Sequence, residues 1–371
     1  MKITFVMPGY SLKPVGGIKV VYEYANQLAS RGHEVTVVHP RRWDWTEARI
    51  RSDKSAASRL IALCWWLNRK MRRDPKSNVE GEVQWFPFDN RVKLLYIPEP
   101  RPLFFPNGDA ISWYGKDCPP EKGKQFLILQ GYGVFSRELE DALFRLPAPK
   151  IVIARWLYEQ GLKLGVSPEE MVYIPNGFDH SRYRIVHPIE RRSPRIAMLY
   201  HPQPLKGAED GIRALELARR KFPALQAALF GIFPRPGTLP GWIEYYHDPP
   251  QEDLINSVYN GSSIYLCPSW TEGFHLPPGE AMACGCAIVS TDIGGVRDYA
   301  EHGITALLSP SKNPKALAEN IIRLLENDDL RIRIAKAGHE RIQQFTWERS
   351  TDLLEQFLED IIGRRSLQEK R

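Results

Sequence analysis

The sequence predicts an α/β fold with two Rossmann-like domains, each built on a parallel β-sheet. At 371 residues the chain is longer than one ordinary α/β core requires, so two domains are expected. Residues 2–7 and 34–38 have the apolar pattern of buried strands, and 18–30 has the apolar spacing of a helix between them. A second alternation of strands and helices begins at residue 196, after the polar stretch 187–195. Strand–helix–strand order at this spacing is typical of parallel, doubly wound sheets.

The two alternations divide the chain at this polar stretch. In the first domain, predicted as 1–186, further strands are expected at 83–86, 110–113, 126–129, 151–153 and 172–174, and a helix at 156–164. In the second domain, predicted as 187–349, strands are expected at 196–200, 227–231, 243–246, 264–266 and 287–290, with a helix from Gly207. Three helices close the chain, and an apolar face at helical spacing marks the first of them as part of the core.

The composition, with 43% hydrophobic and 25% charged residues, is that of a soluble globular protein. No apolar run approaches the roughly 18 residues that a membrane-spanning helix needs, and the N-terminal segment is interpreted as a strand and not as a signal peptide. The five cysteines form an odd set without regular spacing, which favours a reducing, cytoplasmic location over a disulfide framework. Cys284 and Cys286 lack a second pair at ligand spacing, so we interpret them as small buried residues and predict no metal site.

One segment accounts for the net charge of the protein. Residues 41–75 contain ten basic and four acidic side chains, and the difference of +6 equals the formal charge of the whole chain. This excess predicts an anionic surface as a neighbour. No recognised nucleic-acid-binding module accompanies it, so nucleic acid is not an expected partner. The adjacent apolar run 60–67, which contains Trp65 and Trp66, fits either internal packing or contact with an anionic membrane.

In dinucleotide-binding domains, the loop after the first strand has a characteristic glycine pattern. In this chain the loop contains Gly9, Gly16 and Gly17, but no G-x-G-x-x-G pattern. The second strand ends in His39 and Pro40, where such folds place an acidic residue for the ribose hydroxyls. Both observations argue against NAD, and we predict no cofactor.

Residues 268–291 carry the most informative motif, in which seven residues separate Glu272 from Glu280. The intervening stretch 273–279 is rich in glycine and proline and is predicted to be a loop, with Glu280 in the first turn of the following helix. The helix dipole favours a carboxylate there, and its two oxygens could accept hydrogen bonds from vicinal hydroxyls such as those of a ribose. Taken alone, each glutamate also fits a structural role. Glu280 would stabilise the helix start, and Glu272 would be an exposed loop residue.

At these residues the sequence resembles the retaining glycosyltransferases of family GT4, which have the GT-B fold. Their signature E-G-F-x-L-P-x-x-E-A-M-A-x-G is matched by residues 272–285 at every fixed position. Four shorter segments in the family's order extend the resemblance over nearly the whole chain, namely 16–17, 174–179, 206–207 and 292–298. The resemblance implies two facing domains with a cleft between them, and a C-terminal helix at about 350–371 that packs back on the first domain.

The resemblance also implies that the chain transfers a sugar from a nucleoside-diphosphate sugar, which it binds mainly through the second domain. Glu280 would hold the ribose of the donor, and Lys206 would neutralise the leaving diphosphate. Glu272 would orient the donor sugar and favour the positive charge that develops at its anomeric carbon. The remaining donor-binding positions are the backbone N–H groups of Phe274 and His275, the glycines Gly16 and Gly17, Asn176 and His201.

Two positions depart from the family pattern. His201 stands where the family has an arginine five residues before Lys206, so one cationic partner of the diphosphate is missing or pH-dependent. Gln130 follows the strand at 126–129, where many members have a histidine, and a glutamine cannot act as a base. This feature and the stretch 153–157 resemble the rhamnosyltransferase-type branch, which builds bacterial surface polysaccharides. A missing base fits a mechanism in which the leaving phosphate takes the acceptor proton on the same face, with retention of configuration.

The expected activity is therefore retaining, metal-independent glycosyl transfer to a saccharide, lipid-linked or other hydroxyl acceptor, in cell-surface polysaccharide synthesis. Two alternatives stay open. The chain could be a sugar-nucleotide epimerase or hydrolase of the same fold, or an inactive subunit that binds sugar nucleotides. A lipid-linked acceptor would place the enzyme at the inner face of the cytoplasmic membrane, where the basic segment 41–75 would contact anionic lipid.

Overall fold

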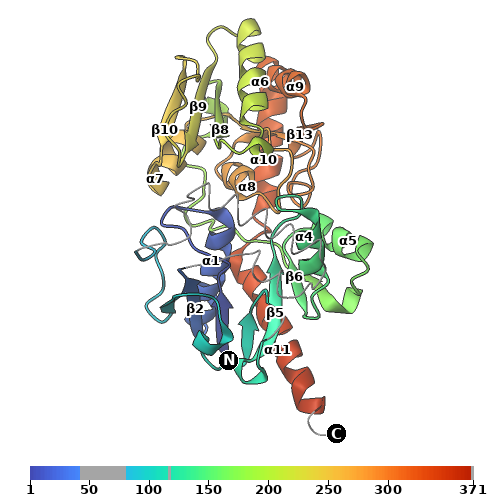
Figure 1. The fold of residues 1–371 in the computed structure, drawn as a ribbon. Coiled ribbons are helices and arrows are strands. Elements are labelled where there is room, and N and C mark those ends of the chain that lie inside the picture. The colour runs from blue at the N-terminus through green and yellow to red at the C-terminus, as the bar shows by residue number, and fades with distance from the viewer. Residues whose placement is uncertain (42–80, 116–117, 369–371) are drawn as a thin grey trace, which may run out of the picture.

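The computed structural model describes residues 1–41, 81–115 and 118–368, and it contains a parallel β-sheet in each half of the molecule (Figure 1). The first sheet has the strand order β3-β2-β1-β4-β5-β6-β7, and the second has the order β10-β9-β8-β11-β12-β13. Every pair of neighbouring strands within them is parallel. The predicted α/β fold with two Rossmann-like domains is confirmed.

The described residues form the following elements. The first sheet contains β1 (Lys2–Val6), β2 (Glu34–Pro40), β3 (Lys93–Ile97), β4 (Ala110–Ser112), β5 (Lys124–Leu129), β6 (Lys150–Val152) and β7 (Met171–Tyr173). The second contains β8 (Arg195–Leu199), β9 (Gln226–Gly231), β10 (Ile243–His247), β11 (Ile264–Cys267), β12 (Ala287–Thr291) and β13 (Ala306–Ser309). The helices of the first half are α1 (Gly16–Ser30), α4 (Arg137–Phe144) and α5 (Arg155–Lys163).

The later helices are α6 (Ala208–Lys221), α7 (Gln251–Asp253), α8 (Leu276–Ala283), α9 (Pro314–Glu326), α10 (Asp328–Ile342) and α11 (Trp347–Gln368). Helix α7 continues as a π-helical stretch, Leu254–Tyr259. Short 3₁₀ turns occur at Pro102–Phe104, Pro120–Lys122, Pro168–Glu170, Ile189–Arg191 and Pro204–Lys206.

The segment 83–86, which we predicted as a strand, is not one. Its aromatic residues instead pack against helix α1. The ring of Tyr22 in α1 lies 5.6 Å from that of Trp85 and 5.2 Å from that of Phe86. The Trp85 Nε1–H also donates to the carbonyl oxygen of Ser11, in the loop before α1. The strand at this edge of the sheet is β3, which pairs with β2. The apolar pattern of this segment thus reflects burial against a helix and not strand pairing.

Helix α11 returns from the second half of the molecule to the first (Figure 1) and packs against α1 there. The ring of Tyr24 in α1 meets the ring of Trp347 edge-on at 5.4 Å. Further along α11, the ring of Phe357 lies 5.9 Å from that of Phe126 in β5. Over the described residues the chain therefore crosses between the two halves twice, once between β7 and β8 and once before α11.

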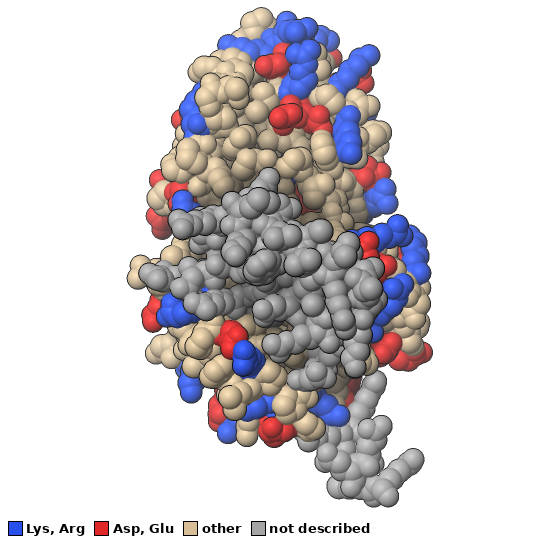
Figure 2. Space-filling view, in the orientation of Figure 1, with Lys and Arg blue, Asp and Glu red and all other residues tan. Residues whose placement is uncertain are grey.

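The basic segment 41–75 lies outside the described residues except for Arg41, and so do Trp65 and Trp66. Contact between this segment and an anionic surface stays a prediction. On the face shown in Figure 2, basic side chains gather over the far end of the second domain, with acidic side chains among them. Within the described ranges, no helix is long and apolar enough to cross a membrane, and no group of three or more His, Cys, Asp or Glu residues is arranged to hold a metal ion.

His39 lies near the end of β2 in a buried aromatic cluster, where its exposed fraction is 0%. Its ring stacks on the ring of Tyr96 with 4.8 Å between centroids, and its Nε2 lies 2.8 Å from the hydroxyl oxygen of Tyr22. Burial lowers the pKa of His39 from 6.5 to about 4. The imidazole is therefore uncharged at neutral pH in the folded protein.

Acid is expected to destabilise the fold through His39. In the unfolded chain this ring gains a proton as the pH falls through 6.5, whereas in the folded protein it stays neutral until about pH 4. Unfolding thus takes up a proton between these values, and the free energy of unfolding falls with the pH. We expect this residue to contribute a loss of about 2 kcal/mol between pH 7 and pH 5. Urea unfolding of wild type and His39→Gln at both pH values measures it, because only the change with pH is compared. An equal loss in the two proteins would contradict the expectation.

Candidate active site

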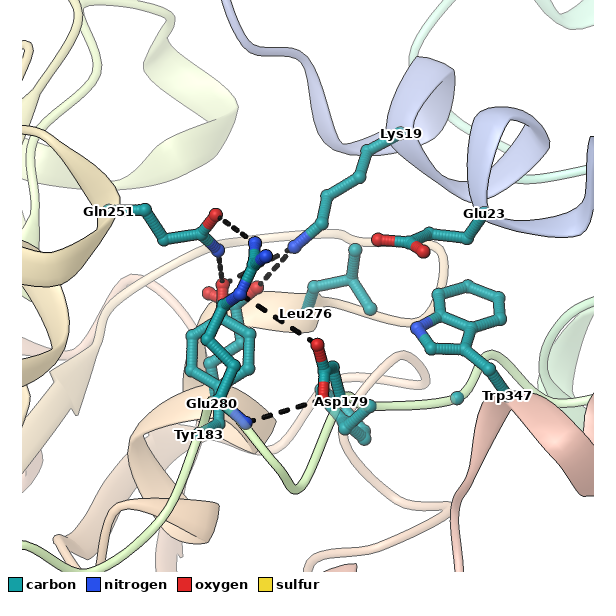
Figure 3. A pocket seen from close by; sticks show the side chains of 11 residues that line it. Lys19, Glu23, Asp179, Tyr183, Gln251, Leu276, Glu280 and Trp347 are labelled. Atoms are coloured by element: carbon teal, nitrogen blue, oxygen red, sulfur yellow. Dashed lines mark hydrogen bonds and ion pairs between the residues drawn. The ribbon is translucent and has the colours of Figure 1, made fainter. Parts of the chain in front are cut away.

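A narrow pocket lies where helix α1 of the first domain meets helix α8 of the second (Figure 3). Charged side chains from both domains line it, and the free space at its centre is about 10 Å³, roughly the room that one water molecule needs. Lys19 and Glu23 come from α1, Tyr183 from the chain that connects the two sheets, and Gln251 and Glu280 from the second domain. The predicted ribose-binding carboxylate is therefore part of an interdomain pocket.

Glu280 is buried in the wall of this pocket, with 7% of its surface exposed. Its Oε1 accepts a hydrogen bond from the Lys19 Nζ at 3.2 Å, and its Oε2 accepts one from the Tyr259 hydroxyl at 3.1 Å. Burial alone would lower the pKa of Lys19, but Glu280, Tyr183 and Glu23 together outweigh burial and raise it, so Lys19 is a cation. The Lys19 Nζ also donates to the Tyr183 hydroxyl at 3.3 Å. In the free protein, Glu280 is thus engaged in an ion pair with Lys19 of the other domain (Figure 3).

The prediction that Glu280 lies in the first turn of a helix is wrong. Helix α8 begins at Leu276, so Glu280 is its fifth residue, and its first turn contains no acidic residue. Pro277 and Pro278 are part of the helix, because the first turn does not use the N–H that proline lacks. Residues 276–279 are therefore helical and not a loop. The helix dipole and a capping role therefore do not explain the position of the Glu280 carboxylate. Its hydrogen bonds with Lys19 and Tyr259 explain it.

Lys206 and Glu272 are joined by two hydrogen bonds. The Lys206 Nζ donates to Oε1 of Glu272 at 2.8 Å and to Oε2 at 2.9 Å. Lys206 ends a 3₁₀ turn, and Gly207 follows in the left-handed conformation with a φ of 61°. A Cβ on Gly207 would lie 2.1 Å from the carbonyl oxygen of Pro268, so the lysine reaches the loop of Glu272 only because a glycine stands here. The two predicted catalytic residues are thus in direct contact.

The Glu272 side chain is largely shielded from solvent, with 10% of its surface exposed, so Glu272 is not the exposed loop residue of the alternative interpretation. Burial alone would raise the pKa of Glu272, but the charges of His275 and Lys206 outweigh burial and lower it. The His275 Nε2 lies 3.4 Å from the Glu272 Oε1. The group is therefore ionised at neutral pH and can stabilise a positive charge close to it.

Phe274 and His275 connect this carboxylate to helix α8. His275 precedes the helix in the left-handed conformation with a φ of 64°, which is rare for a residue other than glycine. The Phe274 side chain is 1% exposed and packs against the rings of Phe178 and Tyr299. Among the described residues, neither the Phe274 nor the His275 backbone N–H has a hydrogen-bond partner. Phe274 can therefore reach a ligand only through its backbone.

The glycine pair that opens helix α1 faces the second domain. A Cβ on Gly16 would lie 3.9 Å from Leu276, the first residue of α8, and one on Gly17 would lie 3.1 Å from the Gln130 Oε1. The Gln130 Nε2 donates to the carbonyl oxygen of Gly17 at 3.0 Å. A Cβ on Gly273 would lie 1.8 Å from the backbone carbonyl oxygen of Gln130. Gln130 therefore lies between the glycine pair and the loop that contains Glu272.

His201 and Asn176 lie near the site in different ways. The Nδ1 of His201 accepts a hydrogen bond from the Gln203 backbone N–H at 3.0 Å. Burial, and then the charge of Lys206, lower the pKa of His201, so its ring does not supply the charge of the missing arginine at neutral pH. Asn176 is 2% exposed, and its Oδ1 has no partner among the described residues. No hydrogen bond of the described residues joins Asn176 to Glu280, and its donor-binding role stays a prediction.

The first domain also contacts the loop of Glu272 through residues for which the sequence predicted no such contact. The Trp156 Nε1–H donates to the carbonyl oxygen of Gly273 at 2.7 Å. The carboxylate of Asp298, in the second domain, accepts a hydrogen bond from the Arg155 backbone N–H at 3.2 Å. Asp298 thus places a negative charge at the start of α5, where the helix dipole favours it. Nothing in the spacing of the sequence relates residues 155 and 156 to this loop.

The chain is similar to known glycosyltransferases. Residues 180–341, which include Lys206, Glu272 and Glu280, match the family of glycosyl transferases group 1. Phosphatidyl-myo-inositol mannosyltransferase of Mycobacterium tuberculosis is 25% identical in an alignment that covers 98% of each chain. D-inositol 3-phosphate glycosyltransferase of Saccharomonospora viridis is 32% identical over 108 residues, which cover 29% of this chain and 25% of that protein. The chain thus spans about a quarter of the length of the first curated relatives it matches.

Solved structures share the fold over nearly the whole chain. Sucrose-phosphate synthase from Thermosynechococcus elongatus superposes with a TM-score of 0.69 at 17% identity and covers 98% of this chain and 99% of its own. HepE of Anabaena in complex with UDP-glucose superposes with a TM-score of 0.68 at 16% identity and covers 97% of this chain and 100% of its own. The chain therefore has the GT-B fold. Residues 180–341 match the glycosyl transferases group 1 family, and the resemblance to GT4 is confirmed.

Proposed function

We propose that the chain is a retaining glycosyltransferase that moves a hexosyl or deoxyhexosyl group from a nucleoside-diphosphate sugar to a hydroxyl acceptor, in cell-surface polysaccharide synthesis. The observation that carries the proposal is the contact between Lys206 and Glu272, with Nζ 2.8 and 2.9 Å from the two carboxylate oxygens. Breaking the glycosyl bond makes the diphosphate more negative and the anomeric carbon more positive. A cation and an anion side by side match these two charges. The UDP-glucose in the HepE structure supports a donor of this class.

The donor would lie between helix α1 and the start of helix α8. Helix α1 has no capping side chain at its N-terminus, so its first N–H groups are open to an anion. The backbone N–H groups of Phe274 and His275 lack partners among the described residues, and they supply further donors for phosphate or sugar oxygens. Glu280 would accept hydrogen bonds from the ribose hydroxyls once Lys19 moves off its Oε1. Donor binding would thus replace a contact between the two domains, the hydrogen bond from Lys19 to Glu280, that exists in the free protein.

The transfer step needs no protein base. The bond between the anomeric carbon and the diphosphate oxygen breaks, and a bond between this carbon and the acceptor oxygen forms on the same face. The acceptor proton passes to the departing phosphate oxygen. Lys206 stabilises the charge on that phosphate, and Glu272 stabilises the positive charge on the sugar. Gln130, which donates to Gly17 and cannot take a proton, fits this scheme.

A ligand screen followed by product analysis tests the proposal. One nucleotide sugar should raise the melting temperature, because a ligand at 100 times its dissociation constant adds about 2.7 kcal/mol to the free energy of unfolding. With that donor, glycoside should form only when an acceptor is present, and EDTA should not abolish the reaction, since Lys206 supplies the charge for the diphosphate. Free sugar or an isomerised donor without acceptor would favour the hydrolase or epimerase alternative. Binding without any turnover would favour the inactive subunit.

The acceptor is proposed to be a saccharide, and a lipid-linked one in particular. Two observations support this. Residues 41–75 carry a charge of +6 in the sequence, and the mannosyltransferase relative is named after a phospholipid, phosphatidyl-myo-inositol. Each basic residue near an anionic bilayer contributes about 1 kcal/mol to binding. Co-sedimentation should rise with anionic lipid in the vesicles and fall with salt. A protein that stays in the supernatant at low salt with anionic vesicles contradicts membrane contact.

A further inference from the structure

A row of four polar groups runs from the interior of the second domain to the catalytic contact. At its inner end, the Cys267 Sγ lies 3.2 Å from the Nδ1 of His275. The Nε2 of the same ring lies 3.4 Å from the Glu272 Oε1, and the Glu272 carboxylate holds Lys206 at 2.8 and 2.9 Å. Cys267 is 1% exposed and His275 is 7% exposed. The imidazole is therefore enclosed between a thiol and a catalytic carboxylate.

Neighbouring groups hold both the backbone and the ring of His275. Its backbone has the left-handed conformation at the start of α8, and its carbonyl oxygen accepts a hydrogen bond from the Tyr299 hydroxyl at 2.7 Å. Cys267 is the last residue of β11, a strand in the middle of the second sheet. The thiol is thus held by a central strand. Because Nδ1 of His275 faces this thiol, Nε2 is the ring nitrogen that faces the Glu272 carboxylate.

We propose that His275 is a positioning residue, whose imidazolium is held by the Cys267 sulfur and keeps Glu272 ionised and in place while Lys206 moves its contact to the donor diphosphate. This inference rests on the proposed function, because it assumes that Lys206 meets a diphosphate. It assigns a role to the His275 side chain in addition to the backbone N–H. His275 does not itself touch the reacting atoms.

The charges around Glu272 show why a second cation is needed. When Lys206 turns to the diphosphate, the carboxylate loses two hydrogen bonds in a place where 10% of its side chain is exposed. A buried carboxylate without a partner takes up a proton, and a neutral group no longer stabilises a positive anomeric carbon. His201 cannot replace the lysine, since burial and Lys206 lower the pKa of its ring. His275 is the cation that stays next to the carboxylate.

The groups that face His275 favour its charged form. Burial alone would lower the pKa of His275, but Cys267 and Glu272 outweigh burial and raise it. Burial alone would raise the pKa of the Cys267 thiol, but the charge of His275 and the hydrogen bonds from His275, Ser290 and Ser269 together lower it. Lys206 opposes the charge on the ring, so its departure toward a diphosphate strengthens the imidazolium. In the described part of the chain, the other titratable groups close to this row are His201, whose pKa is lowered, and the buried hydroxyls of Tyr265 and Tyr299, which carry no charge at neutral pH.

The first test measures the charge on the ring in the ligand-free protein. The imidazole C–H signals of His275 are assigned by NMR from their absence in His275→Gln, and they are followed against pH. The midpoint should lie above the ordinary value of histidine in the wild type. It should fall in Cys267→Ala, which removes the sulfur, and fall less in Cys267→Ser, which keeps a hydrogen-bonding group. Cys286→Ser, which changes a buried thiol away from this row, should leave the midpoint unchanged. A ring that is neutral at pH 7 in the wild type overturns the proposal.

The second test uses turnover. His275→Gln should lower kcat by about tenfold and change KM for the donor by much less, because the side chain acts through Glu272. The wild-type kcat should fall at alkaline pH, with a midpoint above the one that NMR measures in the ligand-free protein, because Lys206 no longer opposes the charge on the ring once it faces the diphosphate. This decline should be absent in His275→Gln. His339→Gln is the matched control, since its Nδ1 lies 2.9 Å from the Ala283 carbonyl oxygen at the other end of α8. The control should keep the wild-type pH profile.

The outcomes separate this inference from the proposed function. If the wild type transfers no sugar, the proposed function fails while the NMR titration still reports the charge on His275. If transfer occurs and His275→Gln keeps the same alkaline decline and the same kcat, the ring is only a core residue and the positioning role is wrong. A His275→Gln variant that is merely less stable, with an unchanged pH profile, also contradicts the positioning role.

Discussion

Lys206→Ala is expected to lower kcat by about a hundredfold to a thousandfold, even when the donor is saturating. The Nζ of this lysine is placed against Glu272 in the free protein, and in the reaction it would face the departing diphosphate. Removing one charge aimed at a developing anion raises the barrier by about 3–4 kcal/mol. The loss should persist at high donor concentration, because the interaction strengthens as the glycosyl bond breaks. Steady-state kinetics at several donor concentrations measures it.

A second lysine provides the control for this experiment. The Lys336 ammonium pairs with Glu190 at 2.6 Å on an exposed surface, and Lys336→Ala should leave kcat within about twofold of the wild type. Lys206→Arg should recover part of the rate, since it keeps a positive charge with a different shape. A Lys206→Ala enzyme that regains full turnover at high donor concentration would show that Lys206 only helps binding.

Glu280→Gln is expected to weaken both the fold and the binding of nucleotide. In the folded protein the carboxylate is 3.2 Å from the Lys19 Nζ, and 22% of the lysine side chain is exposed. Removing the negative charge leaves a largely buried cation without its partner, which should cost about 2–4 kcal/mol of the free energy of unfolding. The variant should also bind free nucleotide and nucleotide sugar about tenfold or more weakly, because charge-assisted hydrogen bonds to the ribose are lost. Chemical unfolding and calorimetry measure the two effects separately.

The two roles of Glu280 can be separated with a variant of its partner. Lys19→Met removes the cation and keeps the apolar stem, so the double variant Lys19→Met/Glu280→Gln should recover much of the lost stability. It should not recover nucleotide affinity, which depends on the carboxylate. Lys19→Met alone should still bind nucleotide, since Tyr259 continues to hold Glu280. Restored nucleotide affinity in the double variant would show that Glu280 is only a structural partner of Lys19.

The sequence predicted the fold well because its signals are local. Buried strands such as β1, β5 and β9 are short apolar runs, and the alternation with helices determines the class of fold. It did not predict β3, where the strand Lys93–Ile97 is only partly buried and its apolar pattern is weak. The aromatic residues at 83–86 produced a false strand, because burial against a helix and burial in a sheet select the same residue types.

The candidate site could be predicted only where its residues belong to a motif. Glu272 and Glu280 were found in this way, but the start of α8 was misplaced because prolines are typical of both loops and first helical turns. Lys19 and Trp156 contact the site across the domain boundary, and the distances along the chain to their partners are 261 and 117 residues. No spacing rule covers contacts of this kind, so their part in the site follows only from the packing of the two domains.

The anomeric configuration of the product tests the central proposal most directly. An acceptor is glycosylated with a nucleotide sugar of known configuration, and the one-bond coupling between the anomeric carbon and its hydrogen is measured by NMR before further purification. Attack on the face from which the diphosphate leaves, with Lys206 on the phosphate and no protein base, predicts that the product has the configuration of the donor. An inverted product would contradict the account, because it requires attack from the opposite face with a base that the site is not proposed to contain.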